Sequence, residues 1–412
     1  MSATRLSKSL SALVMTLVFP LQAGLSQEPA PTPQSRQGVI AAQQLEKAGQ
    51  TPTPKVDKFQ MWYERIEQIF LEDPSGWYPY FASVYHGGGF TLGSGFRQYF
   101  GDNSYWDVKG LYSIKHYKLI QGALESRDHL GKRLSFGTRV GWRDATQVAY
   151  YGLGIKTSSD DRANFRFQET YTDGHAVFRP VWWIPLKGSI GYERWDTKEG
   201  KGTAPSIETM YQGDDPTGRN YAPGLHADPK YLHTQVSAGI DWRQSPGYTR
   251  RGGLYDVTFH DYKSDQDGRY SFQKVDGNLI QHIPLLRETW VLAARGRVET
   301  TLNDNDLIPY FLLPSLGSGS TLRAFNTDRF RDRHSLLMTA EFRWTPSVAL
   351  DMALFYEAGK VASRRKDLNF KEMKSDVGIG ARFHGPRTTP IRLEFAVGNE
   401  GWRIVIAGGA VF

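Results

Sequence analysis

The sequence predicts an all-β protein whose strands cross a membrane as an antiparallel β-barrel. Three observations lead to this fold class. The N-terminus reads as a secretory signal peptide, and no later segment is apolar enough to form a membrane-crossing helix. Much of the remaining chain alternates between apolar and charged residues at the period of a β-strand, which is the pattern of a barrel with one lipid-facing and one lumen-facing surface.

The first 26 residues have the organisation of a signal peptide. Arg5 and Lys8 precede an apolar run over residues 10–21, and a small-residue cleavage site follows around Ala23. The run is too short to span a bilayer, which disfavours a retained membrane anchor. The chain contains no cysteine, so a lipid-modified cysteine and disulfides are both excluded. We therefore expect Sec export followed by cleavage.

Composition narrows the class of protein further. Aromatic residues make up 13% of the chain and there are 42 glycines, yet the mean hydropathy is -0.48. A soluble enzyme rarely needs so many aromatic side chains with so little continuous hydrophobicity. The formal net charge of +7 is spread over mixed signs, and no block of lysine and arginine is long enough to suggest nucleic-acid binding.

Six segments alternate between an apolar and a charged face. In residues 350–358 one parity carries Leu, Met, Leu, Tyr and Ala, whereas the other carries Asp351 and Glu357. A half-buried sheet of a soluble sandwich would also alternate, but its polar face would favour Thr, Lys and Ser. Here the polar face pairs arginine with acidic residues, as expected of a lumen. Further charges predicted to face this lumen are Glu341, Arg343, Arg382, Arg392 and Glu394.

The chain ends on another alternating segment, from Trp402 to Phe412, which we expect to be the last strand. On this parity Phe412 faces lipid. A terminal phenylalanine that closes an alternating strand is the usual sorting mark of Gram-negative outer-membrane barrels. Phe412 is therefore predicted to be a C-terminal sorting signal.

A separate region, residues 27–76, lies between the signal peptide and the barrel, which we place at residues 77–412. The segment 28–34 is a proline-containing periplasmic tether, and residues 38–49 suggest a short polar helix. Residues 59–70 have helical spacing and predict an amphipathic helix of about four turns. Three roles for this helix stay open: a cap on the barrel mouth, a plug in the lumen, or a helix on the periplasmic membrane surface.

Motifs for catalysis and metal binding are weak. His86 to Gly89 resembles an esterase oxyanion loop, but the chain has no G-x-S-x-G motif, which favours a turn before the first strand. No H-E-x-x-H motif is present and the ten histidines are scattered. Gly213 to Gly218 offers oxygen ligands for calcium, although the same residues are typical of a surface loop. We expect no enzyme activity, no cofactor and no metal.

The stretch PSLGSGSTLRAF, residues 314–325, resembles a hallmark of the bacterial surface antigen superfamily of outer-membrane barrels. This superfamily contains the BamA and TamA assembly factors and the two-partner secretion transporters. Its members have sixteen strands, and an R-G-F or R-G-Y loop tip between the eleventh and twelfth strands folds back into the lumen. The matching residues here are Arg323, Ala324 and Phe325.

A second hallmark is an aromatic pair followed by an acidic residue and glycine, and it matches residues 355–361. Together with 377–382 and 390–396, the resemblance covers roughly residues 78–412. There are two departures from the pattern. Ala324 replaces the glycine of the loop tip, and the periplasmic repeat domains of well-known members are missing.

The resemblance, together with strand parity, predicts a latch between Arg323 and Glu357. A guanidinium can form two parallel hydrogen bonds with a carboxylate, which would fix the loop against the inner wall by about 1–3 kcal/mol. Asp351, Glu341 or Glu394 would replace Glu357 if the register differs by a strand. The alternative is a surface arginine in a mobile loop.

The resemblance implies a protein that inserts or translocates polypeptides or lipids at the outer membrane. Two alternatives stay open: a passive solute channel, for which a charged lumen would suffice, and a structural surface-antigen barrel. The expected location is the bacterial outer membrane, and the expected form is a monomeric barrel. Expected partners are outer-membrane lipid and lipopolysaccharide, with substrate polypeptides or a periplasmic partner, and no nucleic acid.

Overall fold

The computed structural model describes Val39 and residues 74–213, 221–266, 268–286, 288–303 and 307–412. The predicted signal peptide, tether and amphipathic helix therefore lie outside the described residues, Val39 apart, as does most of the calcium-loop candidate at 213–218. The chain divides into two units, residues 1–58 and 59–412. All described strands belong to the second unit.

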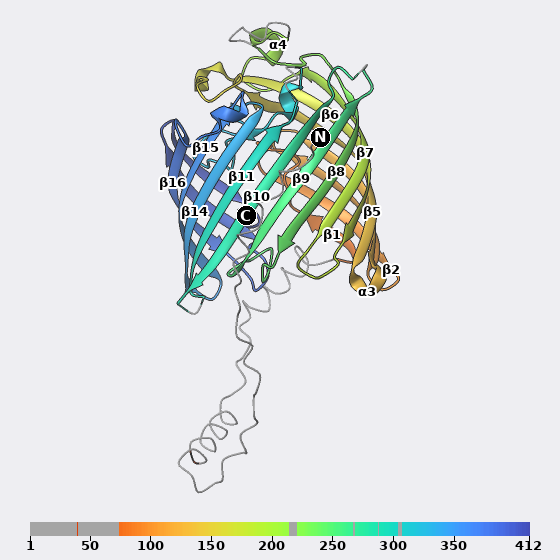
Figure 1. Ribbon diagram of the computed structural model, residues 1–412, viewed down its shortest axis with the longest axis vertical. Helices are drawn as coiled ribbons and strands as arrows, with labels where there is room; N and C mark the ends of the chain where they lie inside the picture. The colour runs from red at the N-terminus through yellow and green to blue at the C-terminus, as the bar shows by residue number, and fades with distance from the viewer. Residues whose placement is uncertain (1–38, 40–73, 214–220, 267, 287, 304–306) are drawn as a thin grey trace, which may run out of the picture. The chain divides into compact units, whose positions relative to one another are not determined.

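The second unit is built on one antiparallel sheet of sixteen strands, which confirms the predicted fold class and strand number. Each strand pairs with the next along the chain, and the sheet curves round into a barrel (Figure 1). The strands are β1 (Gly76–Tyr80), β2 (Thr91–Phe100), β3 (Ser104–Ser113), β4 (Lys118–Asp128), β5 (Leu134–Tyr150), β6 (Ala163–Phe178), β7 (Leu186–Glu199), β8 (Lys230–Asp241), β9 (Gly252–Ser264), β10 (Phe272–Leu285), β11 (Trp290–Thr301), β14 (His334–Ser347), β15 (Leu350–Ala362), β16 (Lys374–Phe383), β17 (Ile391–Gly398) and β18 (Gly401–Ala407).

The longest connection between paired strands of the barrel falls between the eleventh and twelfth strands, β11 and β14, as predicted. There residues 302–333 form a loop that contains a two-stranded sheet of its own, β12 (Ser315–Leu316) and β13 (Phe330–Arg331). We call residues 302–333 the lumen loop, because its described part lies on the inner side of the sheet.

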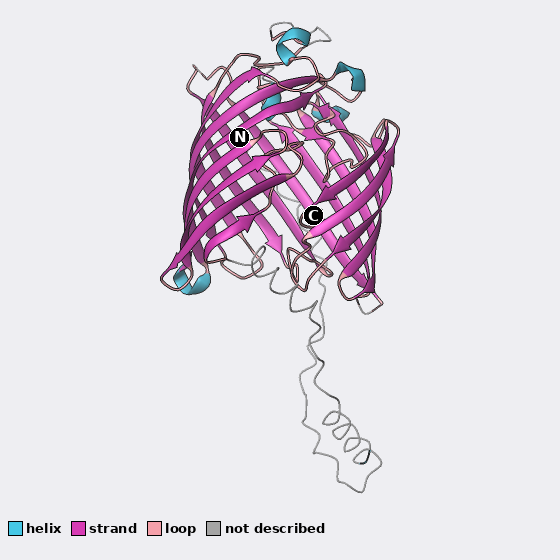
Figure 2. Ribbon diagram, turned by 180° about the vertical axis from the view of Figure 1, so that it is seen from behind, coloured by secondary structure: helices cyan, strands magenta, loops and turns pink. Residues whose placement is uncertain are grey.

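The described helices are short and lie at the two ends of the barrel (Figure 2). They are α3 (His129–Lys132), α4 (Ile207–Met210) and three single 3₁₀ turns, Ser159–Asp161, Tyr310–Leu312 and Arg365–Asp367. In the described part of the chain, no helix has both the length and the apolarity needed to cross a membrane.

The two faces of the sheet differ as the alternation predicts. On β15 the outward side chains of Leu354 and Tyr356 are about half exposed, whereas Asp351 and Glu357 on the opposite parity are buried inside. The same outward exposure of apolar side chains is found on β8, β16, β17 and β18. Because a closed or nearly closed sheet satisfies its backbone groups internally, this surface suits hydrocarbon.

The connections define two ends of the barrel. Long connections follow β5, β7, β11 and β15, and we call this the long-loop end. The opposite, short-turn end has connections such as 101–103 and 348–349. The glycine turn from His86 to Gly89 joins β1 to β2, so the prediction that it precedes the first strand is wrong; β1 already runs through Gly76–Tyr80. Its glycines Gly87 and Gly89 have positive φ, as a turn requires.

The two ends of the sheet do not pair. Between the described residues of β1 and β18, no strand pairing joins the first strand to the last. Both edge strands are short, with 5 residues in β1 and 7 in β18, whereas β5 has 17. Among the described residues, a seam without strand pairing therefore runs between β1 and β18.

The chain leaves the sheet before it ends, which differs from the predicted strand through Phe412. β18 stops at Ala407, and Gly409 has a φ of +80° and donates its N–H to the carbonyl of Thr389 (2.9 Å). Two adjacent glycines thus permit a turn that takes the last residues inward. Phe412 is buried rather than lipid-facing, and its ring lies 5.9 Å from the ring of His282.

The tail packs on the lumen side of β10 and β11. Val411 and Phe412 form an apolar cluster with Ile280 and Ala293, both on inward parities. The guanidinium of Arg343 lies 5.3 Å from the centroid of the Phe412 ring. The residues that follow β18 therefore reach across the short-turn end of the lumen.

We expect deletion of Phe412 to reduce the amount of assembled barrel and to leave precursor in the periplasm, because the terminal aromatic is the predicted sorting signal. The measurement is the outer-membrane level by fractionation. Val411→Ala is the matched control, since it trims the same lumen cluster and keeps the terminal aromatic. Normal outer-membrane levels of the deletion variant, or equal losses in both variants, would contradict the sorting role.

Candidate functional site in the lumen

Apolar residues turn the lumen loop inward. Leu316, Leu322, Phe325 and Phe330 are buried, and they pack against wall residues that include Phe355. The loop bends at Gly317, which has a φ of +103°. A Cβ at this position would lie 2.2 Å from the carbonyl oxygen of Asn326, so only glycine fits. The glycine and serine content of the loop thus reflects a tight internal bend rather than a free surface segment.

Arg323 lies at the centre of the site and its side chain is 0% exposed. Its Nη2 is 2.7 Å from Oε1 of Glu341 on β14, and its Nη1 is 2.7 Å from Oε1 of Glu394 on β17. Its Nε lies 3.1 Å from Oε2 of Glu357 on β15. The sequence predicted these three carboxylates as alternative partners, but in the structure the guanidinium contacts all of them together.

The pairing extends into a lattice of charges on the inner wall. Nη2 of Arg382 is 2.7 Å from Oε1 of Glu341 and 3.1 Å from Oε1 of Glu394. Arg343 contacts Glu341 at 2.8 Å, and Arg392 donates a hydrogen bond to Glu394. The four arginines alternate with the carboxylates, so each charge has a neighbour of opposite sign. We call the set Arg323, Glu341, Arg343, Glu357, Arg382, Arg392 and Glu394 the lumen ion network.

The charge state of Arg323 follows from this environment. Burial alone lowers the pKa of an arginine, but the carboxylates of Glu341, Glu357 and Glu394 more than offset that effect and hold the pKa of Arg323 above its usual range. The guanidinium also lies 3.5 Å from the ring centroid of Phe355, a cation–π distance. Arg323 therefore stays positively charged, and its guanidinium contacts carboxylates of the barrel wall.

The backbone of the loop tip is also hydrogen-bonded to the wall. The N–H of Arg323 donates to Oε2 of Glu357 (2.9 Å), and the N–H of Ala324 donates to Oδ2 of Asp376 on β16 (2.9 Å). Asp376 lies directly opposite Glu357 in the sheet register. Two neighbouring carboxylates thus receive successive backbone donors of the tip.

Alanine in place of the usual glycine is accommodated without a left-handed backbone at Ala324. The positive φ of the tip, 51°, falls on Leu322 instead. Space for the alanine methyl group comes from the wall, because a Cβ at Gly398 on β17 would lie 3.1 Å from the Cβ of Ala324. Phe325 is buried beside it, and its ring centroid is 5.2 Å from that of Phe330.

Asp351 is the one substitute partner that does not reach the tip. Its carboxylate accepts hydrogen bonds from Thr345 (2.6 Å) and Tyr248 (3.0 Å) and lies 3.4 Å from His384. These residues lie near the short-turn end, several pairs along the strand from Glu357. The strand parity of Asp351 was predicted correctly, whereas its height in the barrel depends on the register.

Two further arginines, which were not among the predicted site residues, anchor the rest of the loop. Arg329 donates to both oxygens of Glu400, each at 2.8 Å, and to the side chain of Thr157 at 2.8 Å. Arg331 donates to the carbonyl of Tyr310 (2.8 Å) and its Nη2 is 3.4 Å from Asp328. The residues 329–332, with three charges beside a buried phenylalanine, were the sequence signal for these contacts.

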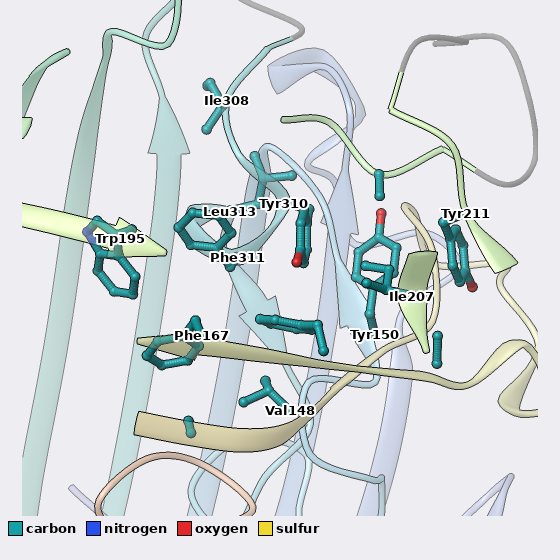
Figure 3. Close-up of a cluster of buried hydrophobic side chains, with 14 of the residues drawn as sticks. Val148, Tyr150, Phe167, Trp195, Ile207, Tyr211, Ile308, Tyr310, Phe311 and Leu313 are labelled. Carbon is teal, nitrogen blue, oxygen red and sulfur yellow. The ribbon is translucent and has the colours of Figure 1, made fainter. Parts of the chain in front are cut away.

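An aromatic cluster fills the lumen toward the long-loop end (Figure 3). Tyr310 of the lumen loop contacts Tyr150 of β5 and Phe165 of β6, with ring centroids 5.2 and 4.8 Å apart. Phe311 contacts Trp195 of β7 at 5.3 Å. The loop therefore contacts the wall strands β5 to β7 through aromatic rings and β14 to β17 through charges.

The described residues contain no group of three or more histidine and acidic side chains arranged to hold a metal ion.

The fold and the lumen site together define a class of protein: a sixteen-stranded transmembrane β-barrel with the loop between its eleventh and twelfth strands bound inside.

Solved structures share this fold. The chain is similar to BamA from Haemophilus ducreyi lacking POTRA domains 1–3, with 13% identity and a TM-score of 0.59, over 81% of this chain and 69% of that one. It is also similar to CdiB from Escherichia coli, with 11% identity and a TM-score of 0.54, over 81% of this chain and 62% of that one. No family model and no curated protein sequence matches the chain. The resemblance inferred from the loop tip is thus confirmed as a likeness of fold.

We expect Arg323→Ala to release the lumen loop and to raise its sensitivity to protease, while the barrel still folds because the strand ladder is untouched. Glu341 and Glu394 still contact other arginines, so the substitution leaves mainly Glu357 without its partner. Breaking this buried ion pair should lower the free energy of unfolding by about 3–5 kcal/mol. Glu357→Gln should act similarly, and the double variant should be less than additive in urea unfolding. Arg323→Lys is the charge-matched control, with an intermediate loss because one ammonium cannot span three carboxylates. Fully additive effects would contradict the latch.

We expect Gly378→Ala to disturb the same site through Phe355. A Cβ at Gly378 on β16 would lie 2.2 Å from the Phe355 ring and 2.3 Å from a backbone oxygen, so the ring that supports Arg323 must move. The cost should be about 1–3 kcal/mol in unfolding free energy, with greater protease sensitivity of the loop. Gly296→Ala on β11 has no neighbour within 4 Å and serves as the control. Equal effects of the two substitutions would contradict this support.

We expect Asp332→Asn to stabilise the protein at pH 7 and to have little effect at pH 4. Asp332 lies in the lumen loop beside a cavity of about 1210 Å³, and burial raises its pKa to about 6. A carboxyl group whose pKa is higher in the folded state destabilises that state increasingly as pH rises from about 4 to about 6. The gain at pH 7 should be at most about 3 kcal/mol by urea unfolding. Asp367→Asn, in an exposed turn, is the control. Equal stabilisation by Asp332→Asn at pH 4 and at pH 7 would contradict burial of the carboxylate as the cause.

Proposed function

We propose that the chain assists the insertion or translocation of polypeptides at the bacterial outer membrane. The observation that carries this proposal is the unpaired seam between β1 and β18. Backbone N–H and C=O groups at a strand edge are costly to leave unpaired in a bilayer and are a ready template for an incoming strand. A polypeptide that adds a strand at the seam would satisfy these groups.

Each edge strand is held independently of the other, so the barrel can stay folded with its seam unpaired. On β1, the ring of Tyr78 covers Gly95 of β2, and its hydroxyl donates to Asp107 of β3. Asp107 is also paired with Arg97 at 3.2 Å. On the other side, Arg403 of β18 donates to the carbonyl of Phe325 in the lumen loop. These contacts supply the support that pairing between the edges would otherwise give.

The filled lumen argues against a passive solute channel. The ion network and loop tip occupy one part of the interior, the aromatic cluster occupies the long-loop end, and the C-terminal tail crosses the short-turn end. A channel for small solutes needs a continuous aqueous path. On this proposal a polypeptide would use a lateral route, along the seam.

The other features of the proposal follow from this role. The protein would reside in the outer membrane as a non-enzymatic, monomeric barrel in contact with lipid and lipopolysaccharide. Recognition of polypeptides would depend on residues 27–76 or on a separate periplasmic partner. The likeness of the loop tip to the assembly factors and secretion transporters supports the same role.

Crosslinking tests the proposal directly. The chain has no cysteine, so single-cysteine variants react at one position only. Ile404→Cys lies on β18 and Val257→Cys on β9, and the native side chains are 56% and 55% exposed, which makes them a matched pair. With a cysteine-attached photocrosslinker, we expect an assembling barrel polypeptide to be captured at position 404 and not at 257. Equal capture at both positions, or a large steady conductance without capture, would overturn the proposal.

A further inference from the structure

Four lumen side chains form a continuous line across β7 to β10, strands that lie outside the ion network. Nδ1 of His233 on β8 lies 2.7 Å from Oε1 of Glu193 on β7. Nε2 of the same ring lies 3.0 Å from Nδ1 of His260 on β9, and Nε2 of His260 lies 3.2 Å from Oδ2 of Asp276 on β10. The line therefore has three contacts that link four consecutive strands.

Counting protons shows that this line is incomplete when both imidazoles are neutral. The terminal carboxylates only accept hydrogen bonds, so His233 must use its proton on Nδ1 and His260 must use its proton on Nε2. Two lone pairs then face each other at the 3.0 Å contact between the rings. One additional proton between these nitrogens turns the repulsive contact into an N–H···N hydrogen bond. A second additional proton would place two N–H groups against each other.

The surrounding charges also call for one positive charge. Glu193 and Asp276 carry two negative charges, and Lys274 places a cation beside Asp276, with its Nζ 3.6 Å from Oδ2. The second oxygen of Glu193 accepts from the indole of Trp195 (3.1 Å), which adds no charge. The other charged or titratable groups nearby on neighbouring strands are Arg143, Glu169, Tyr231, Tyr262, Arg297 and Glu299. Among them, Glu169 is paired with Arg143 and Glu299 with Arg297.

We propose that Glu193, His233, His260 and Asp276 form a binding site for a single proton, which the two imidazoles share. With this proton the site and Lys274 together are neutral, and the line of hydrogen bonds runs unbroken from β7 to β10. The inference stands apart from the proposed function, because it concerns a different wall of the barrel and needs no substrate.

The site is coupled to the aromatic cluster by stacking. The ring of Tyr262 lies 3.9 Å from the ring of His233 with an interplanar angle of 13°, and Phe272 stacks on the other side of Tyr262 at 4.5 Å. Tyr262 and Phe272 belong to the cluster that fills the long-loop end. An imidazolium in this stack attracts the tyrosine ring more strongly than a neutral imidazole. Proton binding therefore tightens the wall beside the cluster.

The test is a ¹⁵N NMR titration of histidine-labelled protein in nanodiscs from pH 8 to pH 5. Signals are assigned by His233→Asn and His260→Asn, and the unsubstituted protein gives the decisive measurement even if a variant folds poorly. We expect both rings to titrate with one common midpoint, each through about half of the full protonation shift. His175 is the internal control, because it lies between Asp173 (3.3 Å) and Glu125 (3.2 Å) without a second imidazole with which to share a proton.

Each remaining outcome overturns the proposal. Full shifts at both rings, with separate midpoints, would show two independent protons. No shift at either ring would show that the pair stays neutral. A change in both ring signals on adding Zn²⁺ at pH 7, without any uptake of a shared proton, would show that the facing nitrogens hold a metal ion instead.

Discussion

The burial of Arg323 is the interaction on which the organisation of the lumen depends. Removing a guanidinium from water costs several kcal/mol unless buried partners compensate its charge and its lost hydrogen bonds. Here Glu341, Glu357 and Glu394 are those partners, and the three carboxylates come from three strands, β14, β15 and β17. A one-residue slip of any of these strands would move its carboxylate to the lipid face. The ion network therefore favours one register for the strands as well as one position for the loop.

The lumen loop also supports the strand that lacks a second neighbour. Gly319 packs against Val405 of β18, since a Cβ at Gly319 would lie 2.9 Å from that side chain. Arg329 pairs with Glu400 in the turn between β17 and β18, and Ala324 fits against Gly398. These contacts all reach the last hairpin from inside. The same residues therefore hold the lumen loop in place and stabilise the open edge of the sheet.

The sequence was sufficient to predict properties that depend on parity. Alternation placed Glu341, Glu357 and Glu394 inside, and the loop tip supplied Arg323. It could not show that one guanidinium reaches three carboxylates, because that depends on the stagger of β14, β15 and β17 and on where the loop tip lies against them. Asp351 has the correct parity and yet lies too far along its strand, for the same reason.

Other misses have different physical causes. Parity alone placed Phe412 on the lipid face, whereas Gly408 and Gly409 allow the chain to leave the strand before it. His233 and His260 are 27 residues apart and looked scattered, because their contact is diagonal between β8 and β9. Such a diagonal contact depends on the register of the two strands and on the twist of the sheet. Local pattern therefore predicts which face a residue occupies, while tilt and stagger decide which residues meet.

The three fillings of the lumen differ in how they can be displaced. The aromatic cluster depends on nonpolar packing, which exposure to water penalises in proportion to the area uncovered. If the loop tip withdrew, the ion network would be left with several unpaired buried charges. The free-energy penalty would then be larger than for the aromatic cluster and would fall on few atoms. The tail is held by Val411 and Phe412 and by a single backbone hydrogen bond at Gly409. Opening a path through the interior would require all three to move, whereas using the seam requires none of them to move. The physical cost of using the edge of the sheet is therefore lower than that of opening its centre, which is consistent with the lateral route of the proposed function.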